Sequence, residues 1–314
     1  MIYWGINALN HGSSIAVFDD NLKLFEFDKT NKLPTDIIDH AMSFGIPDRI
    51  FWYEYPWIKK ARQLYAGQYK IAADLNELPS RYIDQLGLSD IPVTYTPHHG
   101  SHAAAGYYTS PFDHCAIVVI DAIGEFDCAT IWNGMHGEMK KVWSRKYPHS
   151  LGLFYSAFTK LLKLEPIKDE YVLQQLSHRG DPNRFKSIVK MYFDQGTLNL
   201  NYNFHKGVRN WNIDIFNEQD RYDLAAAVQL VFEEQISQIM HIAKTLTNAD
   251  SLVYMGGCAM NSRANKQIVN SWKYTWSLPN PGDPSSAIGA VLYNTKNREW
   301  NYNLGTVTHI QIKI

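Results

Sequence analysis

Alternating and apolar runs at the start of the chain predict a small sheet. Residues 2–7, 13–18 and 22–27 each have the pattern of a strand, and the polar residues 19–21 supply a turn between the second and the third. The loop before the second strand is polar and contains Gly12, so its backbone amides can face an anion. We therefore expect three consecutive strands, with an anion-facing loop between the first two.

The same arrangement begins again near the middle of the chain. The apolar run 115–120 is typical of a buried strand and is followed by Asp121. A glycine turn, a strand at 128–132, a tight turn and a further strand at 139–143 come next. Because this succession of strands and turns occurs twice, we predict two similar sheet-based lobes with a cleft between them.

Helical periodicity dominates the second half of the chain up to residue 252. The segment 219–247 carries apolar residues at helical spacing and predicts a long helix that borders the cleft. A short strand at 252–255 then runs into Gly256 and Gly257, where the backbone can approach a ligand and the free amides of the next helix face it. Further helices are expected at 35–43, 57–75, 150–163, 169–177 and 285–293, with a strand at 50–54 and irregular structure over 181–217.

Composition places the chain among ordered globular proteins. Of its 314 residues 45% are hydrophobic, and the formal net charge of −1 provides no global attraction to nucleic acid. No apolar segment reaches the ~18 residues of a membrane span, and the amino terminus lacks the features of a signal peptide. Three widely spaced cysteines without a CxxC pair favour a reducing setting. We expect a soluble cytoplasmic protein, or one of the host cytoplasm if the source is viral, without a membrane partner.

Two histidines provide the first candidate chemistry. His98 and His102 stand four residues apart at the start of a run of small, helix-compatible residues, so both imidazoles would lie on one face of a helix. This spacing can bring two imidazoles to one metal ion. A pair of capped or surface histidines is the alternative that the motif by itself leaves open.

Two carboxylates strengthen the metal interpretation. Asp121 ends a buried strand, and Asp283 stands at a helix start. Two imidazoles with two carboxylates suit iron(II) or another borderline divalent ion and leave positions open for the oxygens of a ligand. We expect all four side chains in one cleft, beside the Gly256–Gly257 turn.

Ordered motifs extend along nearly the whole chain. They are HHGSHAA at 98–104, VVID at 118–121 followed by Gly124 and Glu125, SLGLFY at 150–155, DLAAAVQ at 223–229, GGCAMNS at 256–262, and PGD at 281–283 followed by AIGA at 287–290. In this order they resemble the amino-terminal domain of the O-carbamoyltransferases of the nodulation-factor and nebramycin type, relatives of the tRNA threonylcarbamoyl transferases. The resemblance implies an α/β fold of duplicated actin-like, RNase H-like lobes. The first lobe would cover 1–112, and the second 113–314 with a helical insertion near 150–247.

The resemblance also implies roles for individual residues. The metal ligands implied are His98, His102, Asp121 and Asp283, which would hold iron(II) or another divalent ion against the phosphates of the nucleotide. A histidine of the first glycine loop lies near the carbamoyl group in that family, which implies His11 as the base. A lysine after the third strand corresponds to Lys32 or Lys29. The nucleotide-binding positions implied are Gly256, Gly257, Asn261, Gly124 and Glu125, with helix capping as the alternative for Glu125.

The implied reaction transfers a carbamoyl group from carbamoyl-adenylate, formed from ATP and carbamoyl phosphate, to an acceptor hydroxyl. A small-molecule sugar or polyketide is the family's usual acceptor, and a hydroxymethylated DNA base such as 5-hydroxymethylcytosine is a further candidate. No counterpart of the family's donor-forming, YrdC-like carboxy-terminal domain follows residue 293 in this sequence. We therefore expect either that a separate YrdC-like protein supplies the donor or that the activity differs.

Several positions depart from the family pattern. Ala122 and Gln175 stand where glycine is expected, Val172 where lysine is expected, and Leu9 where an acidic residue is expected. These positions lie near the expected acyl and acceptor region. The alternative function is a non-catalytic nucleotide- and metal-binding subunit of a larger carbamoyl- or threonylcarbamoyl-transfer complex, of an oligomeric state that the sequence leaves open.

Overall fold

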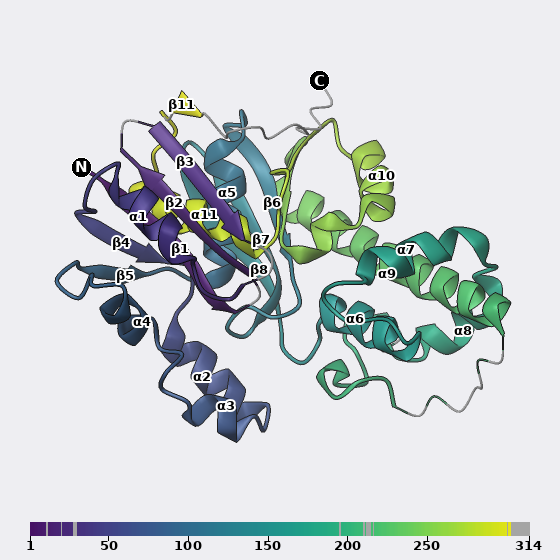
Figure 1. The fold of residues 1–314 in the computed structure, drawn as a ribbon. Helices are drawn as coiled ribbons and strands as arrows, with labels where there is room; N and C mark the ends of the chain where they lie inside the picture. The colour runs from purple at the N-terminus through teal and green to yellow at the C-terminus, as the bar shows by residue number, and fades with distance from the viewer. Residues whose placement is uncertain are drawn as a thin grey trace.

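The computed structural model describes residues 1–10, 12–19, 21–27, 30–194, 196–209, 211, 215, 217–299 and 301–302. Within these residues the chain forms two sheets, with a group of helices to one side of the second sheet (Figure 1). None of the described helices is both long enough and apolar enough to cross a membrane. Two of the predicted catalytic positions, His11 and Lys29, lie outside the described residues.

The first sheet has the strand order β11-β3-β2-β1-β4-β5 within the described residues. The antiparallel meander expected from the sequence consists of β1 (Tyr3–Asn10), β2 (Gly12–Phe18) and β3 (Asn21–Phe27). The strands β4 (Arg49–Trp52), β5 (Val93–Tyr95) and β11 (Asn301–Tyr302) add to it in parallel. Residues 4–9 of β1 and 13–18 of β2 are buried throughout, because helices and neighbouring strands cover them.

The second sheet repeats this topology. Its strands are β6 (His114–Ile120), β7 (Asp127–Met135), β8 (Glu138–Lys146), β9 (Ser251–Met255) and β10 (Tyr274–Trp276). They have the order β10-β9-β6-β7-β8, in which β6, β7 and β8 form an antiparallel meander and β9 and β10 add in parallel. An antiparallel meander followed by two parallel strands on its other side therefore occurs in both sheets, which confirms the predicted duplication.

Within the described residues, four helices lie along the chain between β3 and β5. They are α1 (Thr35–Met42), α2 (Pro56–Tyr65), α3 (Tyr69–Ala73) and α4 (Pro79–Gln85). The sequence predicts one helix over 57–75, but the structure divides this segment into α2 and α3. Gly67 lies between them with φ +78, a left-handed conformation that ends a helix and that glycine adopts without a steric penalty.

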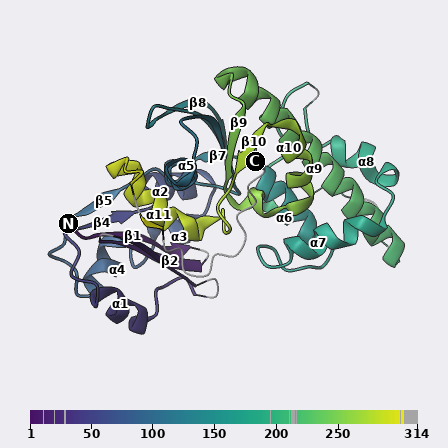
Figure 2. The ribbon, with the colours of Figure 1, turned by 90° about the horizontal axis from the view of Figure 1, so that it is seen from above.

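The helical group of the second lobe covers one face of its sheet (Figures 1 and 2). It contains α6 (Leu151–Leu161), α7 (Glu170–Leu176), α8 (Asn183–Lys190), α9 (Glu218–Thr247) and α10 (Ser262–Ser271), with short 3-10 turns at Ser177–Arg179 and Phe204–Lys206. The long helix α9 begins at a capping box, in which Asn217 and Asp220 each accept a hydrogen bond from the other's backbone amide. It packs against β6 and β7, as its apolar periodicity predicts.

Two helices lie between the sheets and tie the lobes together. α5 (His98–Thr109) precedes the second sheet and packs on β6, β7 and β9, whereas α11 (Ser286–Thr295) follows that sheet and packs on β1, β2 and β4. The two helices also pack closely on each other, since a Cβ on Gly289 of α11 would lie 1.7 Å from the carbonyl oxygen of Ser101 on α5. This crossing brings the beginnings of α5 and α11 to the same place.

Candidate metal centre

The first turn of α5 holds the predicted histidine pair. Pro97 precedes the helix without a side-chain cap, and the carboxylate of Glu125 takes over this function. Its oxygens accept hydrogen bonds from the backbone nitrogen of His98 at 3.0 and 3.1 Å and from that of Tyr55 at 2.9 Å. An anion at a helix amino terminus also interacts favourably with the helix dipole. The structure therefore gives Glu125 the capping role, while its contact with a nucleotide stays a prediction.

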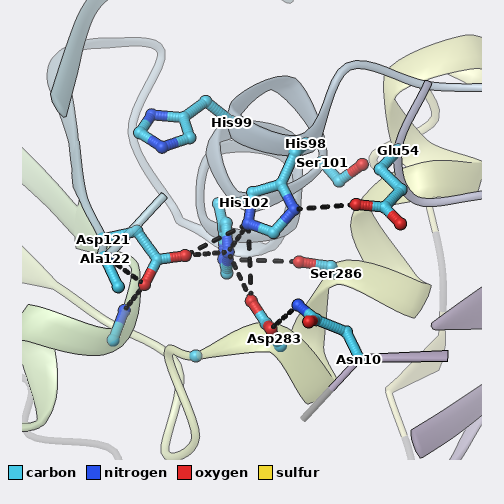
Figure 3. A network of polar contacts seen from close by, with 12 residues as sticks. Asn10, Glu54, His98, His99, Ser101, His102, Asp121, Ala122, Asp283 and Ser286 are labelled. Atoms are coloured by element: carbon cyan, nitrogen blue, oxygen red, sulfur yellow. Dashed lines mark hydrogen bonds and ion pairs between the residues drawn. The ribbon is translucent and has the colours of Figure 1, made fainter. Parts of the chain in front are cut away.

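The four predicted metal ligands come together at this helix start (Figure 3). His98 Nε2 lies 3.2 Å from His102 Nε2, 3.1 Å from Asp121 Oδ2 and 3.4 Å from Asp283 Oδ1. His102 Nε2 lies 3.4 Å from the same Asp121 oxygen and 3.3 Å from the same Asp283 oxygen. One potential ligand atom from each side chain thus faces a common centre, and these atoms all lie within 4.8 Å of one another.

The remaining atoms of the two carboxylates are held by neighbours. Asp121 Oδ1 accepts hydrogen bonds from the backbone nitrogens of Ala122 at 2.8 Å and of Gly257 at 3.3 Å. Asp283 Oδ2 accepts one from Asn10 Nδ2 at 3.3 Å. Each carboxylate therefore presents one oriented oxygen to the centre. In many metal sites, hydrogen bonds to the outer atom of a ligand orient it in this way.

The outer nitrogens of the two imidazoles also have polar neighbours. His102 Nδ1 lies 3.4 Å from Ser286 Oγ at the start of α11. His98 Nδ1 lies 4.0 Å from Glu54 Oε2, and the other oxygen of Glu54 pairs with Lys59 Nζ at 2.7 Å. Figure 3 shows Glu54 approaching His98 from the side opposite Asp121. Such neighbours direct Nε2 of each ring toward the centre.

Electrostatics at the cluster match a site for a cation. Burial by itself lowers the pKa of His98, but hydrogen bonds with Asp121 and Asp283 outweigh burial and hold this pKa well above its usual value. Burial raises the pKa of Asp121, but hydrogen bonds with His102 and His98 hold it well below its usual value. The negative charge of the two carboxylates can therefore be neutralised either by protons on the imidazoles or by a divalent ion at the centre. Two nitrogen and two oxygen donors, each oriented by a neighbour, fit a borderline divalent ion.

The glycine turn after β9 adjoins this cluster. Gly256 has φ +92, and a Cβ there would lie 2.4 Å from the carbonyl oxygen of Ile120. A Cβ on Gly257 would lie 2.9 Å from Asp121 Oδ1. Glycine is therefore required for this turn to approach the end of β6 so closely. Its position beside Asp121 is the one expected for a turn that contacts a nucleotide, and the contact itself stays a prediction.

Two other predicted nucleotide contacts have structural roles. Asn261 caps α10 by accepting a hydrogen bond from the nitrogen of Ala264 at 3.0 Å, and its amide exchanges hydrogen bonds with Gln229 at 2.9 and 3.0 Å. Gly124 lies where a Cβ would be 2.8 Å from Cδ2 of His99. Lys32 is exposed, and its Nζ lies 5.8 Å from the ring centroid of Tyr82. The roles of Lys32 and of His11 as catalytic residues stay predictions.

Sequence reasoning missed three residues that surround the ligands, namely Asn10, Glu54 and Ser286. Glu54 is the last residue of the strand predicted at 50–54, and Asn10 comes soon after the strand predicted at 2–7, so their places near strand ends were a usable signal. The signal is weak, because many polar residues at strand ends face solvent. Only the crossing of α5 and α11 shows that Ser286 reaches His102.

Comparison with known proteins places this geometry in a family context. The family model Carbamoyltransferase N-terminus matches residues 56–292. An uncharacterized protein of Synechocystis sp. is 29% identical over 257 residues, which cover 75% of this chain and 41% of that protein. The nodulation protein NolNO of Sinorhizobium fredii is 25% identical over 211 residues, which cover 64% of this chain and 31% of that protein. The chain thus spans less than half the length of these curated relatives.

Solved structures agree on the fold. Component A of (R)-2-hydroxyglutaryl-CoA dehydratase from Acidaminococcus fermentans matches with a TM-score of 0.52 at 14% identity, covering 94% of this chain and 99% of that chain. Full-length HypF in its phosphate- and nucleotide-bound form matches with a TM-score of 0.50 at 10% identity, covering 96% of this chain and 47% of that chain. At these identities the similarity shows the fold alone, which is the duplicated actin-like α/β fold that the motifs predict.

Proposed function

This chain belongs to the carbamoyltransferase family, and from that premise we propose that it transfers a carbamoyl group from carbamoyl-adenylate to an acceptor hydroxyl. The observation that supports the proposal most strongly is the cluster of His98, His102, Asp121 and Asp283, with its four ligand atoms within 4.8 Å. The glycine turn beside Asp121 offers a backbone surface for the adenylate. A family match without this cluster would support only a vestigial relative.

In the proposed reaction the acceptor oxygen bonds to the carbamoyl carbon. The bond between that carbon and the phosphate oxygen of the adenylate breaks, and AMP leaves with the bonding electrons. The proton of the acceptor hydroxyl passes to His11, which acts as the general base. Lys32, or Lys29, would bind the carbamoyl or phosphate oxygens by charge-assisted hydrogen bonds.

The cluster would hold iron(II) or another divalent ion. When bound, such an ion stabilises the negative charge on the phosphate as AMP leaves. The chain's own contribution is orientation, since Ala122 and Gly257 fix one oxygen of Asp121 and Asn10 holds one oxygen of Asp283. Gly256 lets the turn lie close to the end of β6, beside Asp121.

The donor would come from ATP and carbamoyl phosphate through a separate YrdC-like protein or domain. HypF, whose fold this chain shares, has been solved with phosphate and nucleotide, which favours a nucleotide ligand here. The acceptor classes that we propose to test are small-molecule sugars, polyketides and 5-hydroxymethylcytosine in DNA. A hydroxyl is the feature that they share.

The test is mass spectrometry of an acceptor panel incubated with ATP, carbamoyl phosphate, iron(II) and a donor-forming YrdC-like protein. We expect a carbamoylated product with the wild-type chain and its loss with His98→Ala. The matched control is His241→Ala, which removes an exposed histidine of α9 far along the chain from the cluster. Product formation by His98→Ala at the wild-type rate would refute the proposed site. A negative result for 5-hydroxymethylcytosine with product from another acceptor would remove only the DNA acceptor.

A non-catalytic nucleotide- and metal-binding subunit is the second candidate. The observation that favours it is the apolar Val172 on α7, where the resemblance implies a lysine. Nucleotide titration followed by calorimetry separates the two functions. Tight nucleotide binding without carbamoyl transfer to any acceptor, even with the donor-forming protein present, would favour the subunit.

A further inference from the structure

Arg145, near the end of β8, is a buried cation that forms no ion pair with any described residue. The residue is 5% exposed, and within the described part of the chain no hydrogen-bond partner reaches its Nε, Nη1 or Nη2. It stands opposite the buried Ala129 of β7 in the sheet. Burial lowers the pKa of Arg145 to about 10, and the neighbouring Cys128 offsets part of this effect. The guanidinium is therefore charged at neutral pH.

Arg145 is one of the residues that line a cavity of about 550 Å³. Its lining comes from the end of β8 and the following turn, from the turn 196–199 and from α9. The described lining residues include Arg145, Lys146 and His149 but no aspartate or glutamate, and the neutral polar side chains among them are Ser144, Thr197, Asn199 and Gln238. The cavity therefore combines basic groups with neutral hydrogen-bonding groups.

Other buried or half-buried arginines of the chain have partners. Arg263 Nε pairs with Glu233 Oε1 at 2.9 Å. Arg298 Nη2 donates to the carbonyl oxygens of Tyr107 and Phe112 at 3.1 and 2.7 Å. Burying a charge without a partner costs several kcal/mol, so buried cations are normally paired. Arg145 is the exception that a bound anion would explain.

We propose that this cavity binds an oxyanion group, a phosphate or a carboxylate of a small ligand, against the guanidinium of Arg145. The planar fork of arginine donors matches two oxygens of such a group, and hydrogen bonds between ionised groups are the strong ones in proteins. The site is distinct from the candidate metal centre, because none of the four predicted metal ligands is among the residues that line the cavity. The inference does not depend on the carbamoyl-transfer function.

The experiment compares thermal unfolding and calorimetric titration of the full chain in potassium phosphate, potassium acetate and potassium chloride at equal ionic strength. We expect phosphate or acetate to raise the Tm of the wild type relative to chloride, because a ligand that binds the native state stabilises it. Arg145→Met should weaken binding of that anion by about tenfold or more, the loss expected for a charge-assisted pair. Without the anion, Arg145→Met should unfold no more readily than the wild type, since it removes a buried unpaired charge.

Two further variants keep the test decisive. Arg145→Lys preserves the charge without the fork and should show intermediate affinity, and it serves if Arg145→Met does not fold. Arg184→Met is the matched control, because Arg184 pairs with Asp220 and Asp223 away from the cavity and should leave anion affinity unchanged. Comparing the affinity for phosphate with that for acetate shows which kind of oxyanion the cavity binds. Equal anion affinity in wild type and both Arg145 variants, or no effect of either anion beyond chloride on the wild type, would overturn the proposal.

Discussion

The contact between α5 and α11 allows a sharp test of how the metal centre is assembled. In Gly289→Ala the new Cβ would lie 1.7 Å from the carbonyl oxygen of Ser101, and real Cβ contacts essentially never fall below 3.0 Å. The helices must therefore separate by about 1.3 Å or more, because both sides of the contact are backbone. We expect the free energy of unfolding to fall by about 3 kcal/mol, the upper end of the usual cost of overpacking, and the Tm to fall by ~6 °C.

The same separation should weaken metal binding. Ser101 precedes His102 on α5, and Asp283 lies just before α11. A shift of one helix away from the other therefore increases the 3.3 Å distance between His102 Nε2 and Asp283 Oδ1. Calorimetric titration with a divalent ion, at a temperature where the variant is folded, measures the affinity. Gly282→Ala is the matched control, because a Cβ there would have its nearest neighbour at 3.5 Å. Wild-type Tm and affinity in Gly289→Ala would refute the reasoning.

Three further predictions concern groups around the centre. Burial opposes a charged His98, but hydrogen bonds with Asp121 and Asp283 hold its pKa well above 6.5. Protonated His98 therefore stabilises the folded state fully below about pH 6.5, and this stabilisation is lost as the pH rises through the raised pKa. Urea unfolding of metal-free protein at increasing pH should show this decline, and a flat profile would contradict it. Glu125→Ala should lower unfolding free energy by about 2 kcal/mol by uncapping α5; unchanged urea stability would argue against the cap. Glu54→Ala should weaken metal binding about tenfold in a titration, whereas Lys59→Met, which keeps the carboxylate, should not.

Local patterns predicted much of the fold. The two meanders follow from alternating strands and short polar turns, which are encoded within a few residues of each other. The histidine pair follows from helical spacing alone. The division of 57–75 into two helices depends on the left-handed conformation at Gly67. The sequence does not predict this conformation, because the residues on both sides have a helical pattern.

Contacts distant in sequence were harder to predict. The approach of Asp283 to His98 depends on α11 crossing to the first sheet, and periodicity does not show which sheet a helix packs on. Glu54 is one more carboxylate at a strand end until its place beside His98 is known. The sequence does not show that Arg145 is buried, or that the turn at 196–199 and α9 line a cavity with it.

The crossed helices also explain why one centre can serve both lobes. His98 and His102 lie on α5, which packs on the second sheet, and Asp283 lies just before α11, which packs on the first sheet. The ligands thus lie on or beside helices that pack on both sheets. A divalent ion bound by all four would link the lobes directly.

Anaerobic titration of iron(II) into the metal-free protein tests the central claim most directly. The account predicts one ion bound per chain by the wild type and by the His241→Ala control, with binding lost in His102→Ala and in Asp283→Asn. Stoichiometric binding that persists in both ligand variants would contradict the assignment of this cluster as the metal centre. So would a wild-type chain that binds neither iron(II) nor another divalent ion.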